Sequence, residues 1–146
     1  MRETMNLTRR NLLALGGASI TMTLLPLNVA LGGASETKLA IDALTGGAEI
    51  IDEGVSLTLP ELVEDGNLTP LRVEAEGAVF ITIFAQENPI PEVITFNFGE
   101  LAGSSFVKTR IRLSGTQKVI AIAKMNDGSF RSAASEVKVT VGGCGS

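Results

Sequence analysis

The last five residues carry the thiol on which any covalent chemistry of this sequence would centre. They read Gly142-Gly143-Cys144-Gly145-Ser146, and Cys144 is the single cysteine of the chain. Glycines on both sides of a residue remove side-chain bulk and leave the backbone dihedrals nearly free. The segment therefore predicts a thiol on a thin, flexible tail, with Gly142, Gly143 and Gly145 as the tether that lets other proteins reach it.

The rest of the sequence offers this thiol no catalytic partner. His, Trp and Tyr are absent from all 146 residues, which excludes Ser-His-Asp and Cys-His nucleophile systems, His-rich metal sites and an axial His for haem. A small thiol redox enzyme is disfavoured as well, because no second Cys is present to resolve a mixed disulfide. We therefore expect a protein that is not an enzyme, with no catalytic residue, no metal ligand and no cofactor.

Two functions for such a thiol stay open on the local sequence. One is a covalent carrier whose cargo is processed by separate enzymes. Those enzymes would supply a positive environment, because an ordinary thiol pKa of ~8.5 leaves only about 3 % thiolate at pH 7. The other is an exported structural or adhesion-like domain whose odd Cys forms an intermolecular disulfide.

A strand is predicted directly before the tail, and strands of the same kind recur along the chain. Residues 137–141 alternate apolar and polar side chains, as a strand with one buried face does. This run belongs to a strand at 136–141, and further strands are predicted at 55–59, 71–75, 94–98, 106–113, 118–125 and 130–133, together with an almost wholly apolar run at 78–85. Seven or eight short strands with turn residues between them predict an all-β, immunoglobulin-like antiparallel β-sandwich.

A short helix is predicted before the first of these strands. It covers Thr37 to Leu44, with Ser35 as a candidate N-cap and with Gly46 and Gly47 as the stop. The change from this helical pattern to alternation with a period of two marks the beginning of the sandwich.

Two of the predicted strands raise questions of function. One face of the strand that begins at Phe106 also carries Lys108, Arg110 and Arg112. The simpler interpretation is a solvated face, and the alternative is contact with an acidic partner or an anionic ligand. The apolar run at 78–84 predicts a central strand buried on both faces, with a hydrophobic interface as the alternative.

Residues 1–34 predict an export signal. Arg9 and Arg10 stand just before a mildly apolar stretch that is interrupted by Gly and Thr. The run Thr8-Arg9-Arg10-Asn11-Leu12-Leu13 fits the twin-arginine pattern, and the alternatives are an ordinary secretory signal or a membrane anchor. Because the twin-arginine route moves folded proteins, we expect a periplasmic protein that is exported together with a tightly bound partner. We expect no stable membrane span in the mature chain.

The chain thus divides into a signal at 1–34, a sandwich domain at 35–141 and a carrier tail at 142–146. Cleavage after Ala34 would leave 146 − 34 = 112 residues, with nine basic and fifteen acidic side chains and a net charge of −6. That sign is opposite to the electrostatic footprint of a nucleic-acid binder. We therefore expect no nucleic acid among the partners.

Several segments together are similar to one known family. The tail and the strand before it, 136–146, resemble the C-terminus of the SoxY family, sulfur carriers of the periplasmic thiosulfate-oxidising (Sox) system, whose hallmark is a terminal Gly-Gly-Cys-Gly-Gly. Ser146 stands here in place of the last Gly. Further resemblances are Asn88-Pro89-Ile90-Pro91, Phe96-Asn97-Phe98-Gly99, Thr109-Arg110-Ile111-Arg112-Leu113, Ala121-Ile122-Ala123-Lys124, Asp127-Gly128-Ser129 and the twin-arginine leader.

The resemblance implies a mechanism and a set of partners. A c-type cytochrome enzyme would conjugate thiosulfate to Cys144 and form a cysteine S-thiosulfonate. A hydrolase would then release sulfate, and further enzymes would oxidise or remove the remaining sulfane sulfur. The chain itself would catalyse none of these steps, and it would form a heterodimer with a SoxZ-like subunit that has no signal of its own.

Overall fold

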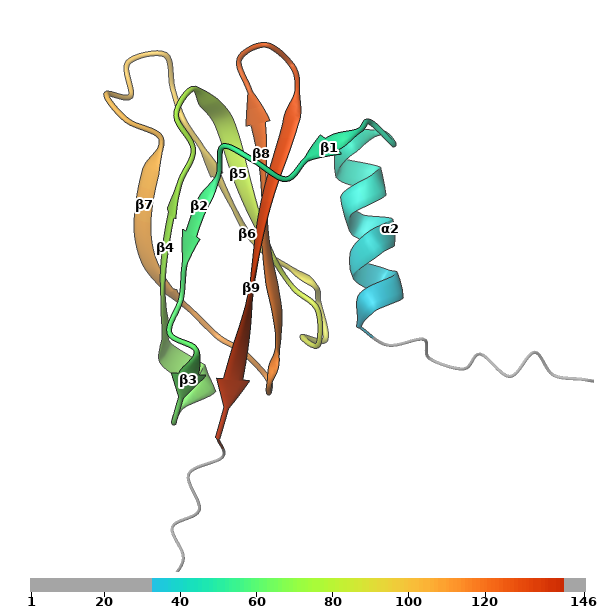
Figure 1. Ribbon diagram of the computed structural model, residues 1–146, viewed down its shortest axis with the longest axis vertical. Coiled ribbons are helices and arrows are strands. Elements are labelled where there is room, and N and C mark those ends of the chain that lie inside the picture. The colour runs from blue at the N-terminus through green and yellow to red at the C-terminus, as the bar shows by residue number, and fades with distance from the viewer. Residues whose placement is uncertain (1–32, 141–146) are drawn as a thin grey trace, which may run out of the picture.

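The structure is a computed structural model that describes residues 33–140 (Figure 1). The predicted export signal with Arg9 and Arg10, and the tail with Gly142, Gly143, Cys144 and Gly145, lie outside the described residues.

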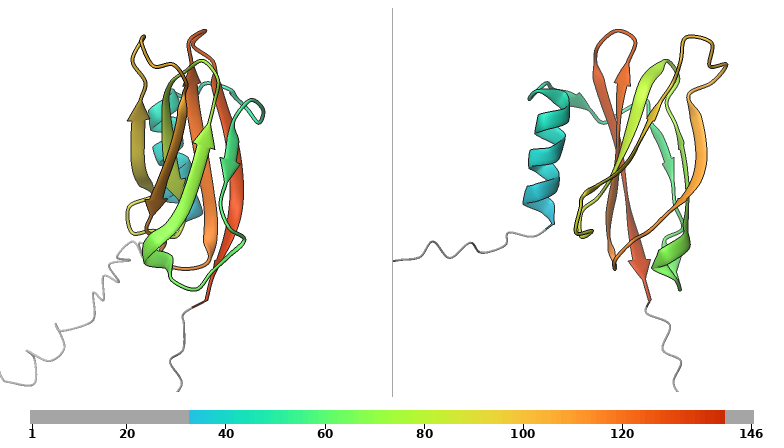
Figure 2. Two further views of the ribbon diagram at one scale, coloured as in Figure 1. Left: turned by 90° about the vertical axis from the view of Figure 1, so that its left-hand side faces the viewer. Right: turned by 180° about the vertical axis from the view of Figure 1, so that it is seen from behind.

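Two β-sheets pack face to face, and one helix lies against the outer side of the larger sheet (Figure 2). In the larger sheet the strand order is β1-β9-β8-β5-β6, and β3 also pairs with β9. Its strands are β1 (Ile50–Ile51), β3 (Leu62–Val63), β5 (Ala78–Ala85), β6 (Glu92–Asn97), β8 (Gln117–Met125) and β9 (Phe130–Val139). The smaller sheet has the order β2-β4-β7, with β2 (Ser56–Thr58), β4 (Thr69–Glu74) and β7 (Phe106–Ile111). The helix α2 (Ala34–Thr45) and the 3-10 turn η1 (Gly66–Leu68) complete the described elements.

The core lies between the two sheets and follows the alternation that the sequence predicts. In β4 the apolar residues Leu71 and Val73 are buried, whereas Arg72 and Glu74 between and after them are exposed. The larger sheet contributes Ile81, Ile83, Val119, Ala121, Ala123 and Val137, all fully buried. Burial of apolar side chains stabilises a domain by roughly 25 cal/mol per Å², so this shared layer holds the sheets together. The sandwich prediction is confirmed.

The predicted helix is present, and its ends differ slightly from the expectation. It begins at Ala34, and the N-cap position belongs to Gly33 rather than Ser35, which lies inside the first turn. It ends at Gly46, whose φ of 66° is left-handed, as the predicted stop requires. Apolar side chains of α2, among them Ile41 and Leu44, pack on Phe84 of β5.

The pairing of β9 departs from a purely antiparallel scheme. The main pairs, including β8 with β9 and β4 with β7, are antiparallel as predicted. The short strands β1 and β3, however, pair with β9 in parallel. The predicted runs at 130–133 and 136–141 are not separate strands. Strand β9 continues from Phe130 to Val139, because Ala134 and Ser135 pair with Ile120 and Val119 without a break, and Val141 lies outside the described residues.

The apolar run at 78–84 forms most of β5, which lies between β8 and β6. Its residues from Ile81 onward are buried, as an interior strand requires, while Val79 is partly exposed. In residues 33–140 no helix is long and apolar enough to cross a membrane.

Candidate functional site

Strand β9 brings the chain to the segment that carries the thiol. It runs along the sandwich from the β8–β9 turn at one end to Val139 at the other (Figure 1). Thr140, the last described residue, stands four positions before Cys144. Four residues span at most about 14 Å, so covalent geometry keeps the Cys144 backbone within that distance of the end of β9.

The end of β9 is hydrogen-bonded on both sides. On one side, the backbone N–H of Lys138 donates to the carbonyl of Glu61 at 2.9 Å, and that of Thr140 donates to Val63 at 2.9 Å. On the other side, Val137 pairs with Gln117 of β8. The chain is therefore part of the sheet up to the residues that directly precede the tail.

Thr116 adds a side-chain anchor at the same place. The backbone N–H of Val139 donates to Oγ1 of Thr116 at 3.0 Å, and the same hydroxyl lies 3.4 Å from the carbonyl oxygen of Val139, to which it can donate. A Thr hydroxyl can donate and accept at once, so a single side chain satisfies both backbone groups of Val139.

Asn88 ties the neighbouring loops together at this end of the sandwich. Its Oδ1 accepts from the backbone N–H of Ser114 at 2.9 Å and from Nε2 of Gln117 at 3.0 Å. Its Nδ2 donates to the carbonyl of Arg112 at 2.9 Å. The amide thus fixes the loop of residues 86–91 against the turn that leads into β8.

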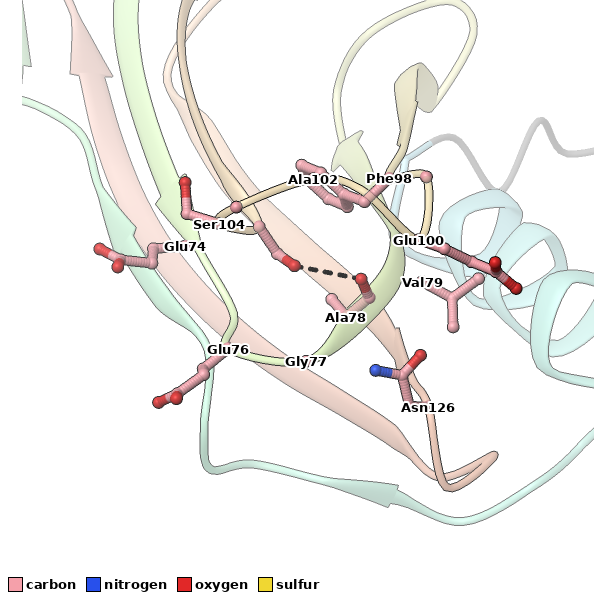
Figure 3. Close-up of a pocket in the computed structure, with 13 residues that line it drawn as sticks. Glu74, Glu76, Gly77, Ala78, Val79, Phe98, Glu100, Ala102, Ser104 and Asn126 are labelled. Carbon is pink, nitrogen blue, oxygen red and sulfur yellow. Dashed lines mark hydrogen bonds between the residues drawn. The ribbon is translucent and has the colours of Figure 1, made fainter.

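A hollow among the described residues lies at the opposite end of the molecule. It measures about 590 Å³, and its lining includes Glu74, Glu76 and Glu100 (Figure 3). Asn126, in the turn from which β9 starts, also lines it. The ten residues of β9 span about 33 Å, more than twice the reach of the tail. This hollow therefore does not receive the thiol of its own chain.

Within 33–140 no group of three His, Cys, Asp or Glu side chains could hold a metal ion. Hydrogen bonds from the side chain and the backbone N–H of Ser129 lower the pKa of Asp127, which lies in the β8–β9 turn at the far end of β9.

Sequence reasoning did not identify the anchors Asn88 and Thr116. Asn88 belongs to the Asn88-Pro89-Ile90-Pro91 motif, which the sequence offered as a family resemblance, and its partners lie 24 to 29 positions away in the sequence. The motif was the signal available in the sequence. The groups that the side-chain amide of Asn88 contacts could be identified only from the fold. The predicted face is confirmed for Phe106, Lys108 and Arg110, which are exposed and alternate with more buried residues. Arg112 is exposed as well but lies just beyond β7, which ends at Ile111 rather than at 113.

Comparison with known proteins connects this arrangement to one family. The family model of SoxY, described as sulfur oxidation protein SoxY, matches residues 41–144. The solved sulfur carrier protein SoxY from Chlorobium limicola f thiosulfatophilum is 29 % identical with a TM-score of 0.65, over 73 % of this chain and 93 % of that chain. No curated protein sequence matches.

A second solved structure shows a likeness of fold alone. Superoxide reductase (neelaredoxin) from Ignicoccus hospitalis is 18 % identical with a TM-score of 0.53, over 60 % of this chain and 80 % of that chain.

Proposed function

The chain belongs to the SoxY family, and from this premise we propose that it is a covalent sulfur carrier that holds thiosulfate-derived sulfur on Cys144. The observation that carries the proposal is the extent of the family match, which runs through the whole sandwich and ends on Cys144 itself. The solved SoxY relative, which is 29 % identical, is named a sulfur carrier protein.

The loading step forms one S–S bond. The Cys144 thiolate joins the sulfane sulfur of thiosulfate to give a cysteine S-thiosulfonate, and its thiol proton goes to solvent. Two electrons leave in this step, and the c-type cytochrome enzyme of the system accepts them. The oxidant is thus a partner protein, and this chain supplies only the sulfur atom that is modified.

The unloading step breaks the bond between the two sulfur atoms of the thiosulfate unit. A hydrolase adds the oxygen of water to the sulfone sulfur, so that sulfate leaves and a persulfide stays on Cys144. Sulfane-oxidising enzymes then act on the outer sulfur. Because every step occurs in a partner's active site, the carrier itself is not an enzyme.

The geometry of the described residues supports this division of labour. A carrier thiol must enter several different active sites while its domain stays folded. The bonds of Lys138, Thr140 and Thr116 keep β9 in the sheet to its end, as a carrier domain that stays folded requires. Gly142, Gly143 and Gly145 add no side chains that a narrow pocket would have to admit.

We place the carrier in the periplasm, as a heterodimer with a SoxZ-like subunit. The twin-arginine reading of Arg9 and Arg10 supports export of the folded pair. The sandwich is the part of the chain that such a subunit would bind.

Intact-mass analysis tests the proposal. The chain is incubated with thiosulfate and the conjugating enzyme, with Cys144→Ser as the matched control. We expect the wild type to gain the mass of one S₂O₃ unit, to retain one sulfur atom after the hydrolase acts, and to show both changes on the C-terminal peptide. The control should gain nothing and should melt like the wild type.

A different mass pattern would overturn the carrier assignment. A disulfide-linked dimer as the only modified form of Cys144 would instead support the structural, adhesion-like alternative. Adducts on the Cys144→Ser control would mean that sulfur attaches elsewhere.

A further inference from the structure

The outer face of the smaller sheet concentrates positive charge in an acidic domain. Residues 33–140 contain nine Lys and Arg against fifteen Asp and Glu, a net charge of −6. Four of the nine cations, Arg72, Lys108, Arg110 and Arg112, lie on β4, on β7 or directly after β7, and all four are exposed. A cluster of positive charge on a domain whose net charge is negative attracts an acidic partner.

The strand register places like charges opposite each other on this face. Arg72 pairs across the sheet with Lys108, and like charges in that position destabilise a sheet. Glu74, at 3.8 Å from Arg72, is the one carboxylate that forms an ion pair among the described residues. The guanidinium of Arg72 on β4 lies 4.7 Å from the ring centre of Phe106 on β7. This cation–π contact holds the Arg72 side chain toward the neighbouring strand. A carboxylate from outside would relieve the repulsion between Arg72 and Lys108.

A shallow groove with an apolar floor runs between these cations. Two adjoining hollows, of about 280 Å³ and about 580 Å³, share Pro70 and Lys108 in their linings. Leu68, which is 64 % exposed, lines the larger of them together with the exposed Pro70. A protein partner can bury more of this apolar surface than a small anion can.

Strand β7 also leaves one edge of its sheet open. It pairs with β4 on one side and ends the strand order on the other (Figures 1 and 2). An edge of this kind presents unpaired backbone N–H and C=O groups that can accept an added strand. A second copy of β7 is a poor candidate, because antiparallel pairing would bring Lys and Arg of the two copies together.

We propose that β7 and the adjoining outer face of the smaller sheet form the docking surface for an acidic protein partner. The partner adds an exposed strand to the free edge of β7 and places carboxylates over Lys108, Arg110 and Arg72. This surface is independent of sulfur loading, so its existence does not rest on the chemistry proposed for Cys144.

A peptide probe tests this surface directly. A short blocked peptide that alternates Thr and Glu is titrated into the isotope-labelled full chain at low salt, and backbone amide signals are followed by nuclear magnetic resonance. We expect shifts confined to β7 and β4, slower hydrogen exchange of β7 amides, and weaker binding as salt is raised.

Charge variants provide the matched comparison. Lys108→Glu with Arg110→Glu should weaken binding about tenfold, as expected for the loss and reversal of two exposed ion pairs. Lys38→Glu with Lys118→Glu changes the net charge equally at exposed sites on α2 and β8 and should leave binding unchanged. The Gln pair at 108 and 110 removes charge without adding repulsion, so it serves if the Glu pair does not fold.

Three results would each overturn the proposal. The first is equal binding of a control peptide with Gln in place of Glu, and the second is shifts scattered over Lys and Arg residues of other elements. The third is full competition by thiosulfate, which would show a site for small anions. Cys144→Ser should bind the peptide like the wild type, so that failure of the carrier function and failure of this surface can be told apart.

Discussion

Gly66→Ala would place a methyl group between the backbone of Leu113 and the side chain of Val139, near the end of β9. A Cβ at this position overlaps the backbone carbonyl oxygen of Leu113 and lies 3.2 Å from Cγ1 of Val139. Gly66 is buried, and its carbonyl accepts the backbone N–H of Leu113 at 2.7 Å. The two segments therefore cannot move apart without losing this hydrogen bond.

The free-energy cost follows from these contacts. Forcing an extra methyl group into a packed site costs about 1–3 kcal/mol, and loss of one hydrogen bond adds about 1 kcal/mol. A total of about 2–4 kcal/mol lowers the melting temperature of a domain of this size by roughly 10–20 °C. We also expect faster hydrogen exchange at Val139, because its side chain must move from the methyl group.

Thermal unfolding followed by far-ultraviolet circular dichroism measures this loss, since the chain has no Trp or Tyr to report by fluorescence. Gly103→Ala is the matched control, because a Cβ there meets nothing within 4 Å. We expect the control to melt close to the wild type. Equal melting temperatures for the two variants would refute the packing argument at Gly66.

Three further predictions concern the ends of the chain and the β8–β9 turn. Arg9→Lys combined with Arg10→Lys should retain the precursor in the cytoplasm, and periplasmic delivery on cell fractionation would instead indicate the general secretory route. Gly143→Val combined with Gly145→Val should slow turnover by the conjugating and hydrolysing enzymes through added bulk and restricted φ/ψ, but should leave the reaction of Cys144 with a small thiol reagent nearly unchanged; normal turnover would remove any role for a slender tail. Hydrogen bonds from the side chain and the backbone N–H of Ser129 lower the pKa of Asp127 from 3.8, so the carboxylate stabilises the turn above that value and the stabilisation is lost as pH falls through the lowered pKa. Acid titration of wild-type stability against Asp127→Asn should show this difference, and parallel curves would contradict it.

The sequence predicted the sandwich because its long strands carry their own pattern. In β4 every second residue is buried, and β5 has the bounds that its apolar run indicates. The strands β1 and β3 were missed because two residues hold a single period, which no alternation rule can detect. Their parallel pairing with β9 depends on the path of the chain between strands, which local pattern does not encode.

The candidate site likewise has a part that the sequence predicts and a part that only the fold shows. Cys144 could be singled out from residue types alone, because it is the single thiol of the chain and glycines flank it, and its role stays a prediction. The anchor of Val139 by Thr116 joins residues 23 positions apart, and the opposition of Arg72 to Lys108 depends on the register of β4 and β7. Contacts of this kind appear only when strands from distant parts of the chain are aligned.

The pairing of β9 also determines how the domain responds to mechanical force. A partner that binds the tail and moves away applies force along the axis of β9. The hydrogen bonds between β9 and β8 lie across that direction. Bonds to β8 on one side and to β1 and β3 on the other are then loaded together in shear, instead of opening one after another as they would in peeling. A pull on the tail therefore meets all of these bonds at once, and dissociation of the partner would leave the sandwich intact.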